Sequence, residues 1–249
     1  MLTFFRRIRK GLLGTGEARK YLLYAVGEIA LVVIGILIAL QINNWNEQKK
    51  QRDREVNSLI EISTELQSNI KNLDFIVHSN SLERKRHKSI STLIRHLEMR
   101  KAYHDSLSQH FTKVFNIGGI TFRNSGYQSL VSIGVDLISN DELRSEIGKL
   151  YSYNVLVLDK VGNEMRDDFY HYILDYLREE FIYTTITDED NSKEIIKPRN
   201  YGSLLNNVEF IQSLKVYSPI QHGFLNECVD VLQETKKVLQ LIKEELNEK

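Results

Sequence analysis

The chain contains very little cysteine, proline and glycine. A single cysteine among 249 residues, Cys228, excludes an internal disulfide network and any zinc site built from several cysteines. Two prolines and 13 glycines are too few for a fold with many turns, such as an all-β sandwich. We therefore expect a chain built mainly from long helices, with enough residues to bury a hydrophobic core.

The chain also has no excess of charge of either sign. Lys and Arg together number 33, and so do Asp and Glu, which gives a formal net charge of zero. Domains that bind nucleic acid usually carry a basic face or stripe. The charge balance therefore argues against nucleic acid as a partner.

Motifs of the common enzyme classes are missing as well. The sequence has no Walker loop, no dinucleotide-binding glycine pattern, no Gly-x-Ser-x-Gly elbow and no His-Glu-x-x-His pair. Glu164, Asp168 and His171 share a helix face, but a di-iron site needs a second acid-x-x-His from a facing helix, which no other histidine provides. We expect a solvated, salt-bridged face there, with no catalytic residues, no metal and no cofactor, and hence a non-enzymatic protein.

Several tyrosines gather in one predicted helix. They either line a cleft for a small molecule or form the edge of the core, and the second interpretation is favoured because their rings are amphipathic. The five are Tyr151, Tyr153, Tyr170, Tyr172 and Tyr176.

The longest apolar run follows a basic start. As a helix, residues 21–42 would extend roughly 33 Å at about 1.5 Å per residue, slightly more than the ~30 Å hydrocarbon core of a bilayer. The stretch from Ile29 to Leu40 is apolar on every face, which does not fit a helix in a soluble core. Tyr21 and Tyr24 at one end and Trp45 at the other are typical of the two membrane interfaces. The sequence thus predicts a transmembrane helix in contact with a lipid bilayer.

Positive charge favours a cytoplasmic N-terminus, although basic residues on the far side of the span reduce the difference. A cleavable signal peptide is the alternative, but the apolar run is long and no small-x-small cleavage site follows it. We therefore predict an uncleaved signal anchor, with 1–20 as a basic cytoplasmic segment and 43–249 as the domain beyond the membrane. The basic residues are Arg6, Arg7, Arg9, Lys10, Arg19 and Lys20 before the span, and Lys49, Lys50, Arg52 and Arg54 after it.

One acid lies inside the apolar run. Glu28, Val32, Gly35 and Ala39 follow one another at steps of four, three and four, so an acid and a small-xxx-small pair share one stripe of the helix. Such groups usually face protein or water, because an ionisable side chain is costly in lipid. The stripe therefore marks either a helix–helix contact, in a homo-oligomer or with a larger membrane protein, or an acid that reaches water or Lys20 near the cytoplasmic surface.

The remaining residues have a helical pattern. A stripe from Val56 to Val77 and a second from Leu82 to Leu97 are separated by the weak point Ser79-Asn80-Ser81. Ser139 and Glu142 have capping-box spacing, so a helix is expected from Asn140. We read 103–122 and 184–202 as loops, and a short helix near 204–216 and a last one after Pro219 complete the pattern. The expected fold class is all-α, an antiparallel helical bundle over 43–249. The stripes comprise Val56, Leu59, Ser63, Leu66, Ile70, Leu73 and Val77, then Leu82, Ile90, Leu93, Ile94 and Leu97, and then Leu143, Ile147, Leu150, Asn154, Val157, Val161, Met165, Phe169, Tyr172 and Tyr176.

Two blocks of the sequence resemble a known family. The first contains Gly-Glu-Ile at 27–29 and Gln-Ile-Asn-Asn-Trp-Asn at 41–46, and the second, at 121–151, reads TFRNSGYQSLVSIGVDLISNDELRSEIGKLY. Both are similar to motifs of a widespread family of uncharacterised single-pass bacterial membrane proteins. The resemblance implies a bacterial inner-membrane anchor with the bundle in the periplasm, and it implies no activity.

Two classes of function are compatible with these observations. The first is a membrane-anchored, non-enzymatic scaffold or accessory subunit that binds a partner in the cell envelope. The second is a sensory or proton-coupled signalling protein that acts through the membrane helix and Glu28.

Overall fold

The computed structural model describes residues 18–247, except 79 and 189–190. The chain divides into two compact units between Glu55 and Val56, and each is considered by itself. Most of the predicted basic segment 1–20 lies outside the described residues. So does the side chain of Tyr21, whose backbone is helical.

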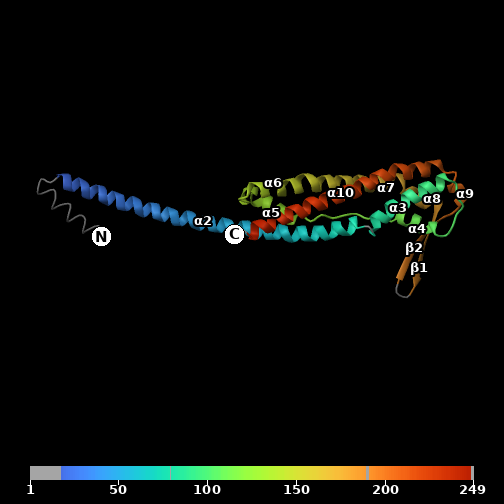
Figure 1. Ribbon diagram of the computed structural model, residues 1–249, viewed down its shortest axis with the longest axis horizontal. Helices are drawn as coiled ribbons and strands as arrows, with labels where there is room; N and C mark the ends of the chain where they lie inside the picture. Colours follow the sequence, from blue (N-terminus) through green and yellow to red (C-terminus); the bar gives the residue numbers. More distant parts are fainter. Residues whose placement is uncertain (1–17, 79, 189–190, 248–249) are drawn as a thin grey trace. The chain divides into compact units, whose positions relative to one another are not determined.

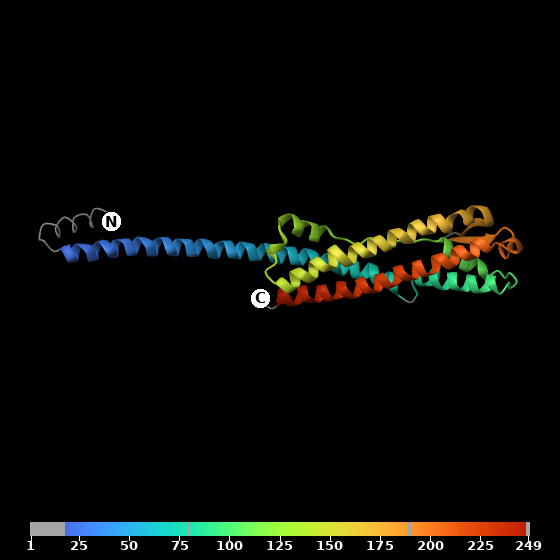
Figure 2. The same cartoon turned by 90° about the horizontal axis from the view of Figure 1, so that it is seen from above.

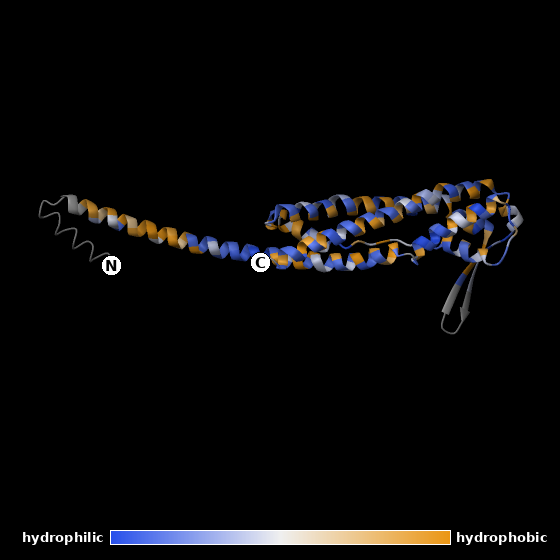
Figure 3. Cartoon of the chain, viewed as in Figure 1, coloured by the Kyte–Doolittle hydropathy of each residue, from blue (hydrophilic) through white to orange (hydrophobic). Residues whose placement is uncertain are grey.

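The described part of the first unit is helical. The helix α2 (Ala18–Val77) is 60 residues long, and its part up to Glu55 belongs to this unit. It contains the predicted span, an apolar stretch that Figure 3 shows in the first part of α2. None of its most apolar window is buried within the protein, unlike the core helix of a soluble protein. Among the described residues this is the one helix long and apolar enough to cross a membrane.

The second unit is a helical bundle with one small sheet (Figure 1). In both Figure 1 and Figure 2, α10 runs back alongside the rod formed by α6, η2 and α7, and α3 also packs against α10. Besides the end of α2, the unit contains α3 (Leu82–Glu98), α4 (Leu107–Phe115), α5 (Ser125–Ile133), the 3₁₀ turn η1 (Val135–Leu137), α6 (Asp141–Lys149), the π-helical turn η2 (Leu150–Asn154), α7 (Val155–Tyr172), α8 (Leu174–Glu180), β1 (Phe181–Asp188), β2 (Asn191–Pro198), α9 (Tyr201–Leu204) and α10 (Val208–Asn247).

The core is formed by the stripes that the sequence predicts. Leu59, Leu66 and Leu73 at the end of α2 are fully buried, as are Ile90 and Leu93 of α3. The stripe of α10 continues along the whole helix at alternating steps of three and four. Its buried members are Leu214, Tyr217, Gln221, Phe224, Cys228, Val231, Thr235, Val238 and Ile242.

The prediction of a loop over 184–202 is wrong, and the fold is mostly helical with one small sheet rather than purely α. β1 and β2 form an antiparallel hairpin whose register runs from Phe181 opposite Pro198 to Asp188 opposite Asn191. The residues of β1, FIYTTITD, are mostly β-branched or aromatic, which favours a strand over a loop. Phe181 fixes the base of the hairpin in the core, with its ring 5.0 Å from that of Phe111.

Two further expectations about helices are wrong. The predicted loop 103–122 contains α4, which is only nine residues long but buries Leu107, Phe111 and Val114 on one side. A short helix near 204–216 and a separate one after Pro219 are in fact the single helix α10, with the proline inside it. Proline costs about 3 kcal/mol in a helix interior, but the buried side chains on both sides of it keep α10 continuous.

The helices α3 and α6 each begin directly after a capping residue. The predicted break at 79–81 is confirmed, since Ser81 caps α3 by accepting a hydrogen bond from the Arg84 N–H at 3.1 Å. The cap of α6 is not Ser139 but the next residue. The Oδ1 atom of Asn140 accepts a hydrogen bond from the Leu143 N–H at 3.1 Å, so the helix begins at Asp141.

The turn η2 shifts the buried face of the rod by one residue. The stripe predicted from Leu143 to Leu150 is confirmed, but Val157 beyond it is only half-buried. A π-helical turn holds one more residue than an α-helical turn, and the N–H of Val155 donates to the carbonyl of Leu150, five residues earlier. Buried positions therefore continue at Val155 and Leu158.

Candidate functional site

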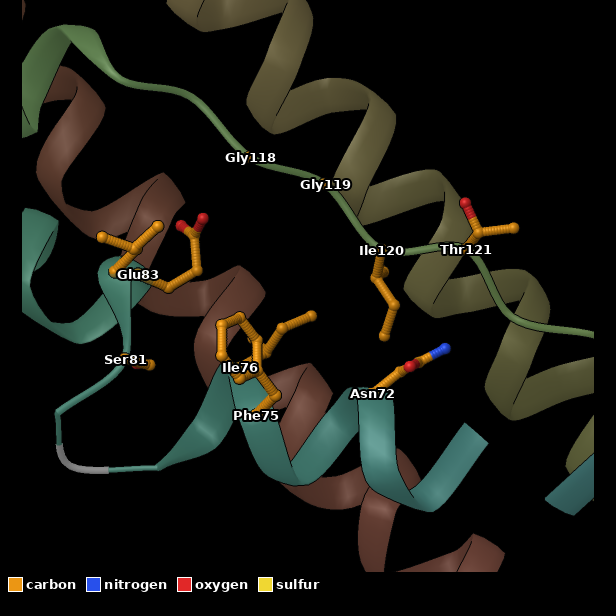
Figure 4. A pocket seen from close by; sticks show the side chains of 10 residues that line it. Asn72, Phe75, Ile76, Ser81, Glu83, Gly118, Gly119, Ile120 and Thr121 are labelled. Carbon is orange, nitrogen blue, oxygen red and sulfur yellow. The ribbon is translucent and has the colours of Figure 1, made fainter. Parts of the chain in front are cut away.

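A cavity of the bundle lies where α2 ends and α3 begins (Figure 4). Its volume is about 360 Å³, within the usual range for small-ligand sites. One wall is the segment 116–124, which crosses the bundle without helix, strand or turn and which we call the strap. The lining residues are Asn72, Phe75 and Ile76 of α2, Ser81, Leu82 and Glu83 at the start of α3, and Gly118, Gly119, Ile120 and Thr121 of the strap.

The strap passes closely between two charged side chains. A Cβ atom on Gly118 would lie 2.8 Å from Oε1 of Glu83, and one on Gly119 would lie 3.0 Å from Nη1 of Arg166. Glu83 comes from α3 and Arg166 from α7. Because glycine has no side chain, the backbone of the strap can approach α3 and α7 closely at the same time, which accounts for the Gly118-Gly119 pair.

A buried ion pair lies next to the cavity. Glu83 and Arg86 are 6% and 1% exposed, and Nη1 of Arg86 donates to Oε2 of Glu83. Nη2 of Arg86 donates to the carbonyl of Asn116, where the strap begins. Gln221 of α10 donates from Nε2 to the Glu83 carbonyl at 3.0 Å. The pair thus links α3, α10 and the strap.

One carboxylate oxygen of this ion pair remains available to a ligand. Oε2 of Glu83 receives the hydrogen bond from Arg86, whereas no donor among the described residues contacts Oε1. Figure 4 shows the Glu83 carboxylate pointing toward Gly118. The site can therefore accept a hydrogen bond from a bound molecule, while Phe75, Leu82 and Ile120 offer apolar surface.

The nearby thiol and phenol are unsuited to nucleophilic chemistry. Burial raises the pKa of Cys228 to about 12, and the negative charge of Glu83 adds to this shift. Burial likewise raises the pKa of Tyr217 far above its usual range. Both groups therefore stay protonated near neutral pH, and the thiolate that attacks substrates in cysteine enzymes does not form.

The second motif of the sequence, around Ser125-Gly126, holds the far end of the strap. Oε2 of Glu65 accepts a hydrogen bond from the Gly126 N–H at 2.9 Å, and Oε1 accepts one from the Ser125 hydroxyl. Asn69 pairs with both backbone groups of Arg123, at 2.8 and 2.9 Å. The Ser-Gly pair is thus a contact between α2 and α5.

Sequence reasoning missed Glu83, Arg86 and Gln221, although a signal was present. Residues 83, 86, 90, 93 and 97 follow steps of three and four along α3, so both charges lie on its buried stripe. Gln221 occupies a buried position of α10 in the same way. A charge or amide on a core stripe indicates a buried polar contact.

The other predicted sites are dispersed. Glu164 pairs with Lys160 at 3.8 Å and His171 is exposed, and no group of three metal-ligating side chains occurs among the described residues. Tyr151 is buried and stacks on Tyr127 at 4.5 Å, whereas Tyr153 and Tyr170 are exposed. The tyrosines therefore do not share one cleft.

The residues predicted for the membrane interface all lie on α2. Val32, Gly35 and Ala39 are exposed, and Gly35 has open space where a Cβ atom would be. Because α2 is helical throughout, Glu28 and these three residues lie along one side of it. Tyr24 and Trp45 are exposed near the two ends of the apolar stretch.

Comparison with known proteins identifies the family. The chain belongs to the family of unknown function DUF6090, whose model matches residues 28–213. No curated protein matches the chain, and no solved structure matches it. The match includes every residue that lines the cavity as well as the strap and the hairpin, but it stops before Gln221.

Proposed function

We propose that this protein is a membrane-anchored, non-enzymatic binding protein of the bacterial cell envelope. In this proposal residues 21–42 span the inner membrane once, with the N-terminus in the cytoplasm and the bundle in the periplasm. An exposed apolar helix and a basic segment before it support the anchor. The bundle then acts as a scaffold or accessory subunit that binds a partner.

The observation that carries the binding function is the α2–α3 cavity. Its carboxylate is buried with its cationic partner, yet it directs one oxygen toward the cavity. Phe75 at its rim is 70% exposed, so a partner that covers its ring would bury apolar surface. A partner that packs on Phe75 and donates a hydrogen bond to Glu83 would bury the exposed ring and pair with the carboxylate oxygen.

Topology is tested first, with the full chain in bacterial cells. Alkaline phosphatase fused after Lys249 is expected to be active, and a fluorescent protein that folds only in the cytoplasm is expected to be dark at the same position. Alkaline extraction is expected to leave the chain in the membrane fraction. The reverse reporter pattern would overturn the orientation, and release of the chain by alkali would overturn the anchor.

Binding is tested by photo-crosslinking in cells. A benzophenone amino acid in place of Phe75 is expected to give a discrete adduct with a partner after irradiation. The same amino acid in place of Ile133, which is 59% exposed on α5 and lies outside the cavity, serves as the matched control. Equal adducts from both positions, or none from position 75, would contradict binding at the cavity.

A further inference from the structure

The strap has hydrogen-bonding capacity that the fold does not use. Within the part of the chain that the structure describes, the backbone N–H and C=O groups of residues 117–122 make no hydrogen bond. Backbone groups in folded proteins are almost always paired with protein or water. These residues are half-buried or exposed, so a ligand can reach them.

Asn69 shows how a planar amide docks on this backbone. Its Nδ2 donates to the Arg123 carbonyl at 2.8 Å, and its Oδ1 accepts from the Arg123 N–H at 2.9 Å. This two-way exchange is the pattern by which one residue of a β-strand pairs with its neighbour on the next strand. The last part of the strap is therefore already paired in the manner of a strand edge.

The same edge continues into the cavity. In an extended segment the N–H and C=O groups of every second residue point to the same side. An extended strap would direct the backbone groups of Thr121 and Gly119 to the side on which Asn69 pairs with Arg123. Asn72 and Ile76, which follow Asn69 on α2, line the cavity together with these two residues.

The charges of the side chains around the cavity also indicate which kind of ligand it can bind. Glu83 is neutralised by Arg86, so the wall offers a hydrogen-bond acceptor without a net charge. Among the residues that the structure describes, no Lys or Arg side chain lines the cavity, which disfavours a phosphate or a carboxylate. Phe75, Ile76 and Leu82 form an apolar surface beside this acceptor.

We propose that the α2–α3 cavity binds an extended peptide segment of a partner protein, which pairs with the backbone of Gly119 and Thr121 as a short added strand. One apolar side chain of the segment packs among Phe75, Ile76 and Leu82, and one of its N–H groups donates to Oε1 of Glu83. Strand addition of this kind obtains affinity from main-chain hydrogen bonds and specificity from side-chain pockets. The inference rests on the proposed binding function and specifies the chemistry of the partner.

The probe is a set of fluorescein-labelled pentapeptides, Thr-Val-X-Val-Thr with blocked ends, in which X is each of the encoded amino acids. Binding to the full chain in detergent micelles is followed by fluorescence polarisation. Peptides with an apolar X are expected to bind more tightly than those with Asp or Lys at X. N-methylation of the amides that flank X is expected to weaken binding at least about tenfold, because it removes the pairing groups.

Matched variants of the protein separate backbone pairing from side-chain contact. Thr121→Pro removes the N–H donor of residue 121 and is expected to weaken binding at least about tenfold, whereas Thr121→Val keeps this donor and is expected to bind more tightly than Thr121→Pro. Phe75→Ala is expected to weaken binding, and Ile133→Ala is not. Thermal unfolding of each variant shows whether the fold is intact, and the N-methylated peptides test pairing without changing the protein.

The glycine amides provide a direct readout. With ¹⁵N-glycine labelling, the Gly119 resonance is expected to shift on peptide addition and its amide to exchange more slowly, while Gly148 and Gly223, in α6 and α10, stay unchanged. If no peptide binds while crosslinking from position 75 persists, the strand proposal is wrong and the binding function stands. Binding that is insensitive to N-methylation and to Thr121→Pro would also overturn strand pairing. Loss of both peptide binding and crosslinking would overturn the binding function itself.

Discussion

Glu65 of α2 and Gly126 of α5 are in direct contact, with the Gly126 N–H donating to Oε2 of Glu65 at 2.9 Å. A carboxylate at the start of a helix pairs with free N–H groups and with the positive end of the helix dipole. The contact requires a residue without a side chain. A Cβ atom on Gly126 would lie 3.1 Å from that oxygen and 3.3 Å from Cγ1 of Ile62.

We therefore expect Gly126→Ala to destabilise the bundle by about 1–3 kcal/mol, the usual cost of overpacking. Gly148→Ala is the control, because a Cβ atom there would meet nothing within 4 Å and α6 would gain a better helix former. Urea denaturation measures both free energies of unfolding. Equal stability of the two variants would contradict the close contact.

The buried ion pair gives a second prediction. Arg86→Met leaves the Glu83 carboxylate buried without its cation and should cost about 3–5 kcal/mol. The double variant Glu83→Leu, Arg86→Met removes both charges and should be more stable than Arg86→Met alone. Denaturant midpoints of the single and double variants test this. A double variant that is the least stable of all would show that the pair is needed as an ionic contact.

Stability should fall on mild acidification. Burial lowers the pKa of both His87 and His110 below the ordinary value of 6.5, and the charge of His222, whose ring stacks on His87 at 4.8 Å, adds to the effect at His87. As the pH falls through 6.5, the unfolded chain takes up protons at these histidines before the folded chain does. The unfolded state therefore binds more protons, and the free energy of unfolding decreases toward lower pH.

The measurement is the thermal midpoint between pH 7.5 and pH 5, for the wild type and for the variants His87→Asn and His110→Asn. Each variant should lose less stability over this range than the wild type does. His171→Asn, at an exposed position, should change the pH profile little. A steeper profile in the His87 or His110 variants would reverse the assigned direction.

The stripe of Glu28, Val32, Gly35 and Ala39 predicts a helix–helix contact in the membrane. Cysteine at 35 or 39 is expected to form disulfide crosslinks between copies, or with a larger membrane protein, more readily than cysteine at 33 or 37. The native thiol of Cys228 is buried and contributes little background. Glu28→Gln should preserve association better than Glu28→Lys, because a fixed positive charge is costly within the bilayer.

Equal crosslinking around the helix, with Glu28→Ala behaving like the wild type, would remove the role assigned to this stripe. The acid would then be one that reaches water near the membrane surface.

Local signals were sufficient to predict much of the bundle. The stripe containing Leu59, Leu66 and Leu73 and the break that separates it from the next stripe depend on neighbouring residues, and both were predicted correctly. The helix α4 was missed although Leu107, Phe111 and Val114 are spaced by four and three, because nine residues hold only two such steps. Its place is fixed by β2, where the Ile196 N–H donates to Thr112 at 3.0 Å across 84 residues of sequence.

The cavity depends even more on distant residues. Glu83 meets Gln221 across 138 residues, and Arg86 meets the start of the strap at Asn116 across 30 residues. Sequence spacing shows that Glu83 and Arg86 lie on a buried stripe, but it does not show what covers them. Contacts of this kind follow from the packing of whole helices.

Because α6 and α7 are joined by the π-helical turn η2, we expect the chain to tolerate the deletion of one residue at this turn. Buried positions fall at 143 and 147 before η2, at 150 and 151 within it, and at 155, 158, 162, 165 and 169 after it, so that the step of five from 150 to 155 interrupts the alternation of three and four. Deletion of the exposed Tyr153 would turn this step into four and let the α-helix run through without moving a core residue to the surface. A chain shortened in this way is expected to fold with a nearly unchanged denaturation midpoint, while deletion of one residue within α7 would rotate half of the buried face into water. We therefore expect η2 to be the place where this rod can lose one residue and still fit the same bundle.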